Sequence, residues 1–413
     1  MPPRSKSGSS DPKSATKPSG GRASKAARSV GDDGGLLMGG REEPAAPSAI
    51  PSTPAATRPV SLDAIHGQAR AKETLRSAMA SGRLPHAWIF HGPPGVGKFT
   101  AALAFAAELL AFDDATRRLL AQGVHPDLGV INKELAVLSR DTRIQQAKQV
   151  TIPKEVIAEF LLDRASLKRA HDGPSHAGRV FIVDEAELLD RSASHAPVQA
   201  AMLKLLEEPP EGTIIILVTA DETKLLTTVR SRCQRVAFAP LSDEELRGWM
   251  ATRGVQASPS EMAWLMSWSQ GSPGRAQLAV DHGLYNWHKT LDPLLSEVES
   301  GRMAAGLVLG TQMCALIDEK ATAAGKADPL ASKDAANRFW VRQLVVYLAS
   351  RAEQNMMSAV ERRDAPAMNR AITMIESIRQ FEGYIAANVA WPTAIQFLVS
   401  QMCNTPRPTG VLT

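Results

Sequence analysis

The chain has 413 residues, of which 44% are hydrophobic, and this length and composition fit a soluble globular protein of two or three domains. It has no apolar run near the roughly 18–20 residues of a membrane helix, and residues 1–30 lack the apolar stretch of a signal peptide, so we expect a cytoplasmic protein. The net charge of +4 lies entirely in residues 1–60, and the neutral remainder argues against a stand-alone DNA-binding protein.

Residues 1–58 are rich in Pro, Gly, Ser and Ala and lack hydrophobic periodicity, so we expect a disordered basic tail. Order is expected from Pro59 onward, and the spacing of apolar residues predicts a helix over Ala69–Ser81. The segment "AWIFH" then reads as a short buried strand that runs into a glycine-rich loop. The Ala- and Leu-rich segment Thr100–Phe112 predicts the helix that follows the loop.

Four more short apolar segments predict strands, and helical patterns lie between most of them. They are Leu128–Ile131, Arg179–Asp184, Thr213–Thr219 and Arg235–Phe238. Short apolar strands that alternate with helices indicate a parallel sheet covered by helices on both faces. We therefore expect residues 59–241 to form an α/β domain of nucleotide-binding type.

The strand patterns stop after Leu241. Ser242 followed by Glu245 is the signature of a capping box at a helix start. Two more short helices are expected after it, interrupted at Gly271–Gly274, so residues 242–281 predict a small helical domain. Four or five longer helical patterns in residues 282–413 predict a C-terminal helical bundle.

The loop between the first strand and its helix has the phosphate-binding pattern, with Gly92, Gly95, Gly97 and Lys98. The pattern alone is weak, but a strand before it and a helix after it let backbone N–H groups converge on a phosphate. Phe99 stands where a Ser or Thr hydroxyl would hold magnesium, and Thr100 is turned by about 100° around the helix. The sequence thus predicts a phosphate cradle with impaired hydrolysis.

A second candidate element is the strand end at Asp184 and Glu185. In nucleotide sites such a pair holds magnesium and polarises the attacking water, whereas elsewhere it is an ordinary solvated turn. The cysteines Cys233, Cys314 and Cys403 are widely separated, which argues against a zinc site.

Several strings resemble the AAA+ clamp-loader ATPases of DNA replication over about Pro59–Asp281. They are "LDAIHGQ", "LKLLEEPP", "SRC" around Arg232 and "GSPGR" ending at Arg275. The resemblance implies an AAA+ module with a helical lid and a C-terminal helical collar. It also implies nucleotide contacts by Thr219 and Arg275 as sensors, and an arginine finger at Arg232 that acts in trans on a neighbour's ATP.

Within that family, Phe99 and the lack of a four-cysteine module make the chain resemble delta-prime subunits of bacterial loaders more than motor subunits. The partners implied are motor and delta-type subunits in a hetero-oligomeric ring, a sliding clamp, and primer-template DNA through the complex. The intact Lys98, Asp184 and Glu185 leave ATP and Mg²⁺ binding open. An active AAA+ ATPase, either a divergent motor or another remodelling enzyme, is the alternative.

Overall fold

The computed structural model describes residues 58–146, 151–167, 170, 176–189, 197–327 and 333–403. The predicted disordered tail, residues 1–58, lies outside these ranges except for Arg58. The Arg58 backbone N–H donates to the Ala121 carbonyl oxygen at 3.2 Å, so the described chain is anchored one residue before Pro59. No helix in the described ranges is both long enough and apolar enough to cross a bilayer.

Within the described ranges, five parallel strands form one sheet in the order β2-β3-β4-β1-β5. The strands are β1 (Ala87–His91), β2 (Leu128–Ile131), β3 (Arg179–Val183), β4 (Thr213–Thr219) and β5 (Gln234–Ala237). The predicted α/β architecture with a parallel sheet is confirmed, and the predicted strands differ from these by at most one residue at an end. Because the strands are parallel, the carboxyl ends of β1, β3 and β4 meet at one edge.

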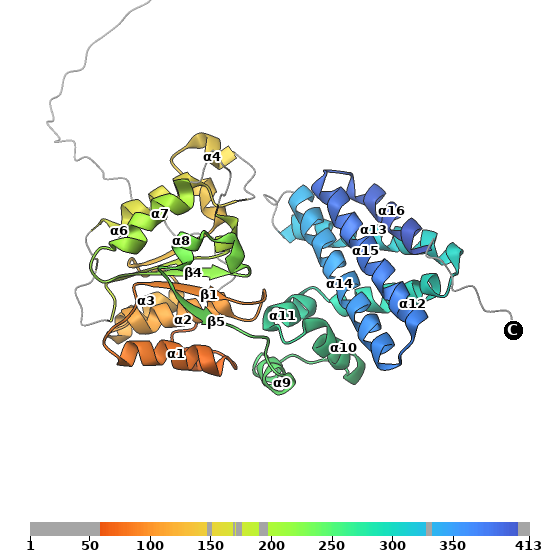
Figure 1. Ribbon diagram of the computed structural model, residues 1–413, viewed down its shortest axis with the longest axis horizontal. Helices are drawn as coiled ribbons and strands as arrows, with labels where there is room; N and C mark the ends of the chain where they lie inside the picture. The colour runs from red at the N-terminus through yellow and green to blue at the C-terminus, as the bar shows by residue number, and fades with distance from the viewer. Residues whose placement is uncertain are drawn as a thin grey trace, which may run out of the picture. The chain divides into compact units, whose positions relative to one another are not determined.

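Helices cover both faces of the sheet, as Figure 1 shows, with α1, α2 and α3 on one side and α7 and α8 on the other. These helices are α1 (Ala69–Ala80), α2 (Lys98–Leu110), α3 (Asp114–Gln122), α7 (Pro197–Glu207) and α8 (Thr227–Arg230). Shorter helical segments are η1 (Leu62–Ala64), η2 (Lys133–Leu138), α4 (Thr142–Gln146), α5 (Lys154–Ile157), η3 (Ala158–Leu162), α6 (Asp163–Ala165), η4 (Ala186–Leu188) and η5 (Glu222–Lys224).

The side chains of β1 show why the strands are apolar without alternation. Trp88 and Phe90 pack on the α2 side, where their ring centroids lie 5.4 and 6.3 Å from that of Phe105. Ile89 belongs to the cluster on the opposite face, which includes Met202 of α7. Both faces of the strand are therefore buried, which is the property that continuous apolar runs predict.

The helix that follows the phosphate loop begins at Lys98 rather than Thr100, and it ends at Leu110 rather than Phe112. Glycine at its N-cap, Gly97, has the left-handed backbone that carries the chain straight from loop to helix. Lys98 and Phe99 are thus in the first helical turn, and their side chains project from it.

Three short helices follow the sheet, α9 (Asp243–Thr252), α10 (Pro259–Ser269) and α11 (Pro273–Asp281). Ser242 and Glu245 form the predicted capping box at the start of α9. The break between α10 and α11 is shorter than predicted, because Gly274 lies inside α11. Ser272 caps this helix by accepting a hydrogen bond from the Arg275 N–H, and Pro273 occupies its first turn, where proline is well tolerated.

The C-terminal region is helical, as predicted. Its helices are α12 (Leu284–Glu299), α13 (Met303–Ala327), α14 (Lys333–Glu361), α15 (Ala365–Ala386) and α16 (Trp391–Cys403). Their buried apolar side chains form one cluster that also includes Leu246 of α9 and Trp268 of α10. This continuous core ties the short helices after the sheet to the first helices of the C-terminal region.

Candidate functional site

The phosphate-loop segment joins the carboxyl end of β1 to the first turn of α2. Gly92, Gly95 and Gly97 have φ angles of 145°, 77° and 97°, which side chains with a Cβ rarely adopt. An added Cβ at Gly92 would lie 2.1 Å from the Phe238 carbonyl oxygen, whereas one at Gly97 would meet no atom within 4 Å. The loop ends at the N-terminus of a 13-residue helix. There the helix dipole and the free backbone N–H groups favour the binding of an anion.

Lys98 is turned back onto its own loop. Its ammonium donates hydrogen bonds to the carbonyl oxygens of Gly92 at 2.7 Å and Pro93 at 2.6 Å, and the residue is buried. Burial lowers the pKa of Lys98, while the nearby carboxylates of Glu187 and Asp184 act in the opposite direction. The positive charge is therefore held by loop carbonyls and by acids of the β3 edge.

Phe99 is partly buried and packs against the hydrophobic cluster on the α2 side of the sheet. Thr100, a candidate nucleotide-binding residue, is exposed. The loop fits a phosphate group, but the residue after Lys98 offers no oxygen ligand, and Mg²⁺ requires near-octahedral oxygen coordination. The described residues contain no group of three or more His, Cys, Asp or Glu side chains arranged to hold a metal ion.

Asp184 lies directly after β3, at the same edge of the sheet as the phosphate loop. Burial raises the pKa of its carboxyl to about 6, although the Glu185 backbone N–H donates to its Oδ1 at 2.9 Å and lowers that pKa. The carboxylates of Glu185 and Glu187 also raise it, and the Lys98 ammonium lowers it. The structure thus brings Asp184 and Lys98 into one electrostatic environment.

The carboxylate of Glu185 is paired with a lysine and is therefore not free to accept a proton from water. Its backbone has a φ of 49°, which is uncommon for a residue with a side chain. Its carboxylate forms an ion pair with Lys133 of η2. Glu187 lies two residues further on, and its carboxylate oxygens accept from the Ala220 N–H at 3.2 Å each.

The two sensor candidates have different surroundings. Thr219 is buried at the end of β4 beside His91, and its hydroxyl oxygen accepts from the Asp221 N–H at 3.1 Å. Arg275 lies in α11 and donates from Nη1 to Gln270 Oε1 at 2.7 Å. Thr219 is therefore next to the start of the phosphate loop, and the guanidinium of Arg275 is bound within its own segment.

Gln68 links the phosphate loop to the segment that leaves the sheet. Its side-chain amide donates to the carbonyl oxygens of Val96 at 3.2 Å and Ala239 at 2.7 Å, and it accepts from the Ala239 N–H at 3.2 Å.

The start of α11 also contacts the loop. Ser272 Oγ donates to the Pro94 carbonyl oxygen at 3.2 Å, and the Gly274 N–H donates to the Gly95 carbonyl oxygen at 2.9 Å. The loop and the start of α11 are thus directly connected.

Arg232 follows α8 and precedes β5. Its Nη2 forms an ion pair with Glu207 Oε1 of α7 at 2.5 Å, and its Nη1 donates to the Thr228 carbonyl oxygen at 2.9 Å. About a third of the side chain is exposed, at 36%. The neighbouring Arg235 instead pairs with Glu222. The guanidinium tip of Arg232 is consequently bound within its own domain, and the side chain remains partly accessible.

The strand register separates Arg232 from the phosphate loop of its own chain. Gln234, at the start of β5, pairs with Trp88, and Ala237 pairs with His91, which immediately precedes the loop. Arg232 therefore belongs to the amino-terminal edge of the sheet, while the loop lies beyond the carboxyl edge. Along the strands, roughly 3.3 Å per residue places the two edges on the order of 15 Å apart.

The α/β domain that carries the phosphate loop and Arg232 is similar to known proteins. Residues 67–242 match the protein family described as "DNA polymerase III, delta subunit". The chain is 31% identical over 211 residues to the DNA polymerase III subunit delta' of Pseudomonas aeruginosa, covering 48% of this chain and 57% of that protein. The α/β domain is therefore similar to DNA polymerase III clamp-loader subunits.

Relatives named as tau subunits are similar to this chain to a comparable degree. The chain is 30% identical to the DNA polymerase III subunit tau of Bacillus subtilis, covering 61% of this chain and 42% of that protein. The chain thus spans about half the length of these curated relatives. Among solved structures, Thermotoga maritima RuvB has a TM-score of 0.36 and 19% identity, over 55% of this chain and 64% of that chain.

Sequence reasoning missed three side chains that hold this AAA+ site together. They are Gln68, Glu187 and Glu207. Gln68 and Glu207 lie inside strings already singled out, "LDAIHGQ" and "LKLLEEPP", and Glu187 lies two residues after the predicted Glu185. The strings marked the positions, but only the folded chain shows that Gln68 bridges two segments and that Glu207 pairs with Arg232.

Proposed function

We propose that this chain is a structural, delta-prime-type subunit of a bacterial clamp loader within the DNA polymerase III holoenzyme. In this role it binds motor and delta-type subunits in a ring, and the complex places a sliding clamp on primed DNA. The similarity of residues 67–242 to the family described as "DNA polymerase III, delta subunit" supports this. We also propose that residues 59–241 act as the AAA+ domain, 242–281 as the lid and 282–413 as the ring-forming collar of a cytoplasmic complex.

The observation that carries the proposal is the position of Arg232 at the amino-terminal edge of the sheet. A guanidinium that stabilises a γ-phosphate must touch it, and Arg232 is separated from its own phosphate loop by the length of β5. Its partners Glu207 and Thr228 leave it partly exposed at the edge of the domain. Arg232 is therefore suited to act in trans, on ATP bound by a neighbouring subunit.

The phosphate loop supports a role without intrinsic hydrolysis. Phe99 supplies no magnesium ligand in any rotamer, because a phenyl ring has no oxygen, and its ring packs against the hydrophobic cluster on the α2 side. Glu185 is paired with Lys133 rather than free to polarise water. We expect the purified chain to hydrolyse ATP no faster than background.

A second candidate function, an active AAA+ ATPase, is favoured by the retention of Lys98 and Asp184 in one electrostatic environment. Two measurements separate the candidates. Steady-state ATP turnover by the purified full chain is compared with that of Lys98→Ala, and a robust rate that Lys98→Ala abolishes would refute the structural role. Co-purification of the tagged chain then asks whether a sliding clamp and motor subunits accompany it.

A further inference from the structure

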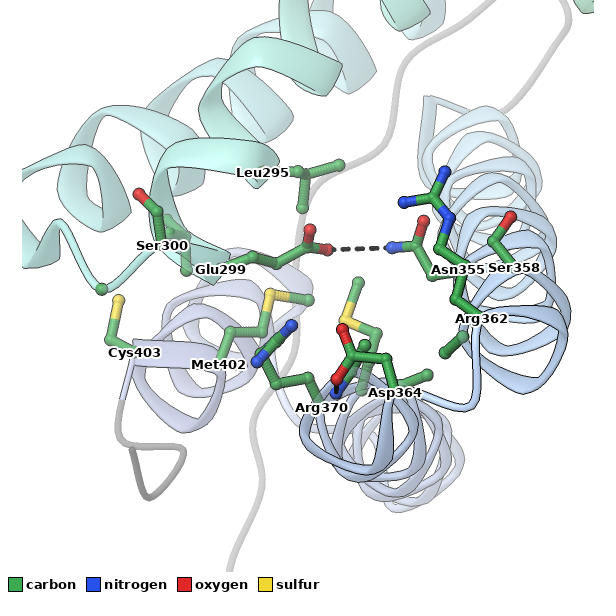
Figure 2. A pocket seen from close by; sticks show the side chains of 16 residues that line it. Leu295, Glu299, Ser300, Asn355, Ser358, Arg362, Asp364, Arg370, Met402 and Cys403 are labelled. Carbon is green, nitrogen blue, oxygen red and sulfur yellow. Dashed lines mark hydrogen bonds between the residues drawn. The ribbon is translucent and has the colours of Figure 1, made fainter. Parts of the chain in front are cut away.

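A second candidate site lies in the C-terminal helices, away from the nucleotide-type loop. A cavity of about 700 Å³ is lined by α12, the end of α14, α15 and α16 (Figure 2). Its apolar wall includes Leu295, Ala359, Ala371 and Met402, all of which are buried. This volume is within the range of roughly 300–1,000 Å³ that is usual for small-molecule sites.

The two carboxylates in the cavity wall are already bound by protein groups. Glu299 Oε1 accepts from Arg351 Nη1 at 3.1 Å and from Asn355 Nδ2 at 3.3 Å, the latter drawn in Figure 2. Asp364 Oδ1 accepts from the Ala367 N–H at 3.0 Å and caps α15. Neither carboxylate is therefore the natural first partner of a bound ligand.

The two guanidinium groups in the same wall are differently placed. Among the described residues, neither Arg362 nor Arg370 forms a salt bridge or a side-chain hydrogen bond, although Arg370 lies close enough to Glu299 to lower its pKa. Arg370 is partly buried and lies beside Met402 in Figure 2, while Arg362 is exposed at the rim. A partly buried arginine without a direct partner next to apolar side chains is a suitable anchor for an anion.

We propose that this cavity binds a small organic anion, with its anionic group held by Arg370 and its apolar body packed against Leu295, Ala371 and Met402. The exposed Arg362 adds positive potential at the entrance. Burial raises the pKa of Glu299, which indicates a poorly hydrated wall, and there a guanidinium–anion contact is stronger than in water. The cavity lies in the proposed collar but has no residue in common with the phosphate loop or with Arg232, so its test does not depend on the proposed roles of those two elements.

Calorimetric titration of the full chain with three probes tests the site. Octanoate carries both a carboxylate and an apolar chain, 1-octanol carries only the chain, and inorganic phosphate carries only the charge. Octanoate is expected to bind with one-to-one stoichiometry and at least about tenfold more tightly than either other probe, because each lacks one of the two contacts. Absence of octanoate binding, or equal binding of 1-octanol, would overturn the proposal.

Substitutions in the cavity wall test whether octanoate binds there. Arg370→Ala should weaken octanoate binding about tenfold, and Arg370→Lys should weaken it less, because the charge is kept. Arg379→Ala is the matched control, since Arg379 is exposed on the same helix outside the cavity. Ala367→Leu, which fills the cavity without removing a charge, should also weaken binding. Thermal melts check that each variant folds, and equal affinities of Arg370→Ala and Arg379→Ala would refute the site.

Discussion

The two edges of the sheet differ in how their charged groups are held. At the carboxyl edge, Lys98 is buried and bound by its own loop, and the pKa of Asp184 is raised to about 6 by burial. At the amino edge, Arg232 is partly exposed and is anchored by Glu207 and a backbone oxygen. The charges of the carboxyl edge are therefore bound by groups of the fold itself, whereas the amino edge has a partly exposed cation that a neighbouring molecule can reach.

The largest expected effect comes from removing the outward-facing cation. Arg232→Ala should leave ring assembly intact and slow ATP hydrolysis by the reconstituted complex, by about 10³-fold if the residue acts as an arginine finger. Arg232→Lys should be nearly as harmful, because lysine cannot offer the bidentate fork. Arg235→Ala is the control, since Arg235 lies three residues further on in β5 and pairs with Glu222 of η5. Unchanged rates with Arg232→Ala at matched subunit occupancy would make it an ordinary surface charge.

The next largest effect is a loss of stability on substituting a loop glycine, and it tests whether close packing fixes the loop conformation. Gly92→Ala should lower the free energy of unfolding by on the order of 3 kcal/mol or more, because its Cβ would lie 2.1 Å from the Phe238 oxygen in a positive-φ backbone. Gly97→Ala should cost only about 1–2 kcal/mol, because it meets backbone strain but no atom within 4 Å. Urea unfolding measures the free energy of unfolding of both variants. Equal losses would show that the close contact at Gly92 is unimportant.

The buried carboxyl of Asp184 makes the stability of the chain depend on pH. Its pKa of about 6 lies above the unfolded value of 3.8, so the native state binds more protons between these values and its stability falls as pH rises through that window. Asp184→Asn removes the cost of the buried charge and should stabilise the chain by on the order of 1–3 kcal/mol at pH 8, with little effect at pH 4.

Urea unfolding at both pH values provides the measurement for Asp184. Asp141→Asn is the opposite control, because the pKa of Asp141 lies at about 2 through its bonds to Arg143. That variant should be slightly less stable at pH 8. A stabilisation by Asp184→Asn that is the same at pH 4 and pH 8 would contradict the assignment to a buried carboxylate.

The smallest expected effect is a gain in nucleotide affinity at the phosphate loop. Phe99→Thr restores a hydroxyl after Lys98 and should tighten magnesium-nucleotide binding by about tenfold, the value of roughly one good polar contact. Phe99→Ala is the control, because it removes the same ring without adding a ligand. Fluorescent-nucleotide titration with and without Mg²⁺ measures the change, and equal affinities of the two variants would show that the missing hydroxyl is not what limits the site.

Local features of the chain could be read from the sequence alone. The five strands were predicted to within one residue at each end, since runs such as Thr213–Thr219 are apolar on both faces and β-branched. The capping box at Ser242 and Glu245 was predicted because its hydrogen bonds join residues three apart. The glycine loop was predicted from its pattern between a strand and a helix, and the positive φ angles of Gly92, Gly95 and Gly97 explain why glycine stands at these positions.

The tertiary structure alone decided which groups meet. Gln68 and Ala239 are 171 residues apart in the chain, and no local pattern encodes their contact. The pairing of Arg232 with Glu207, the turn of Lys98 onto its own loop and the cavity beside Arg370 likewise depend on how separate elements pack. Local hydrogen bonds and steric limits act between near neighbours and can be read in sequence, whereas burial and charge pairing arise only when distant segments are brought together.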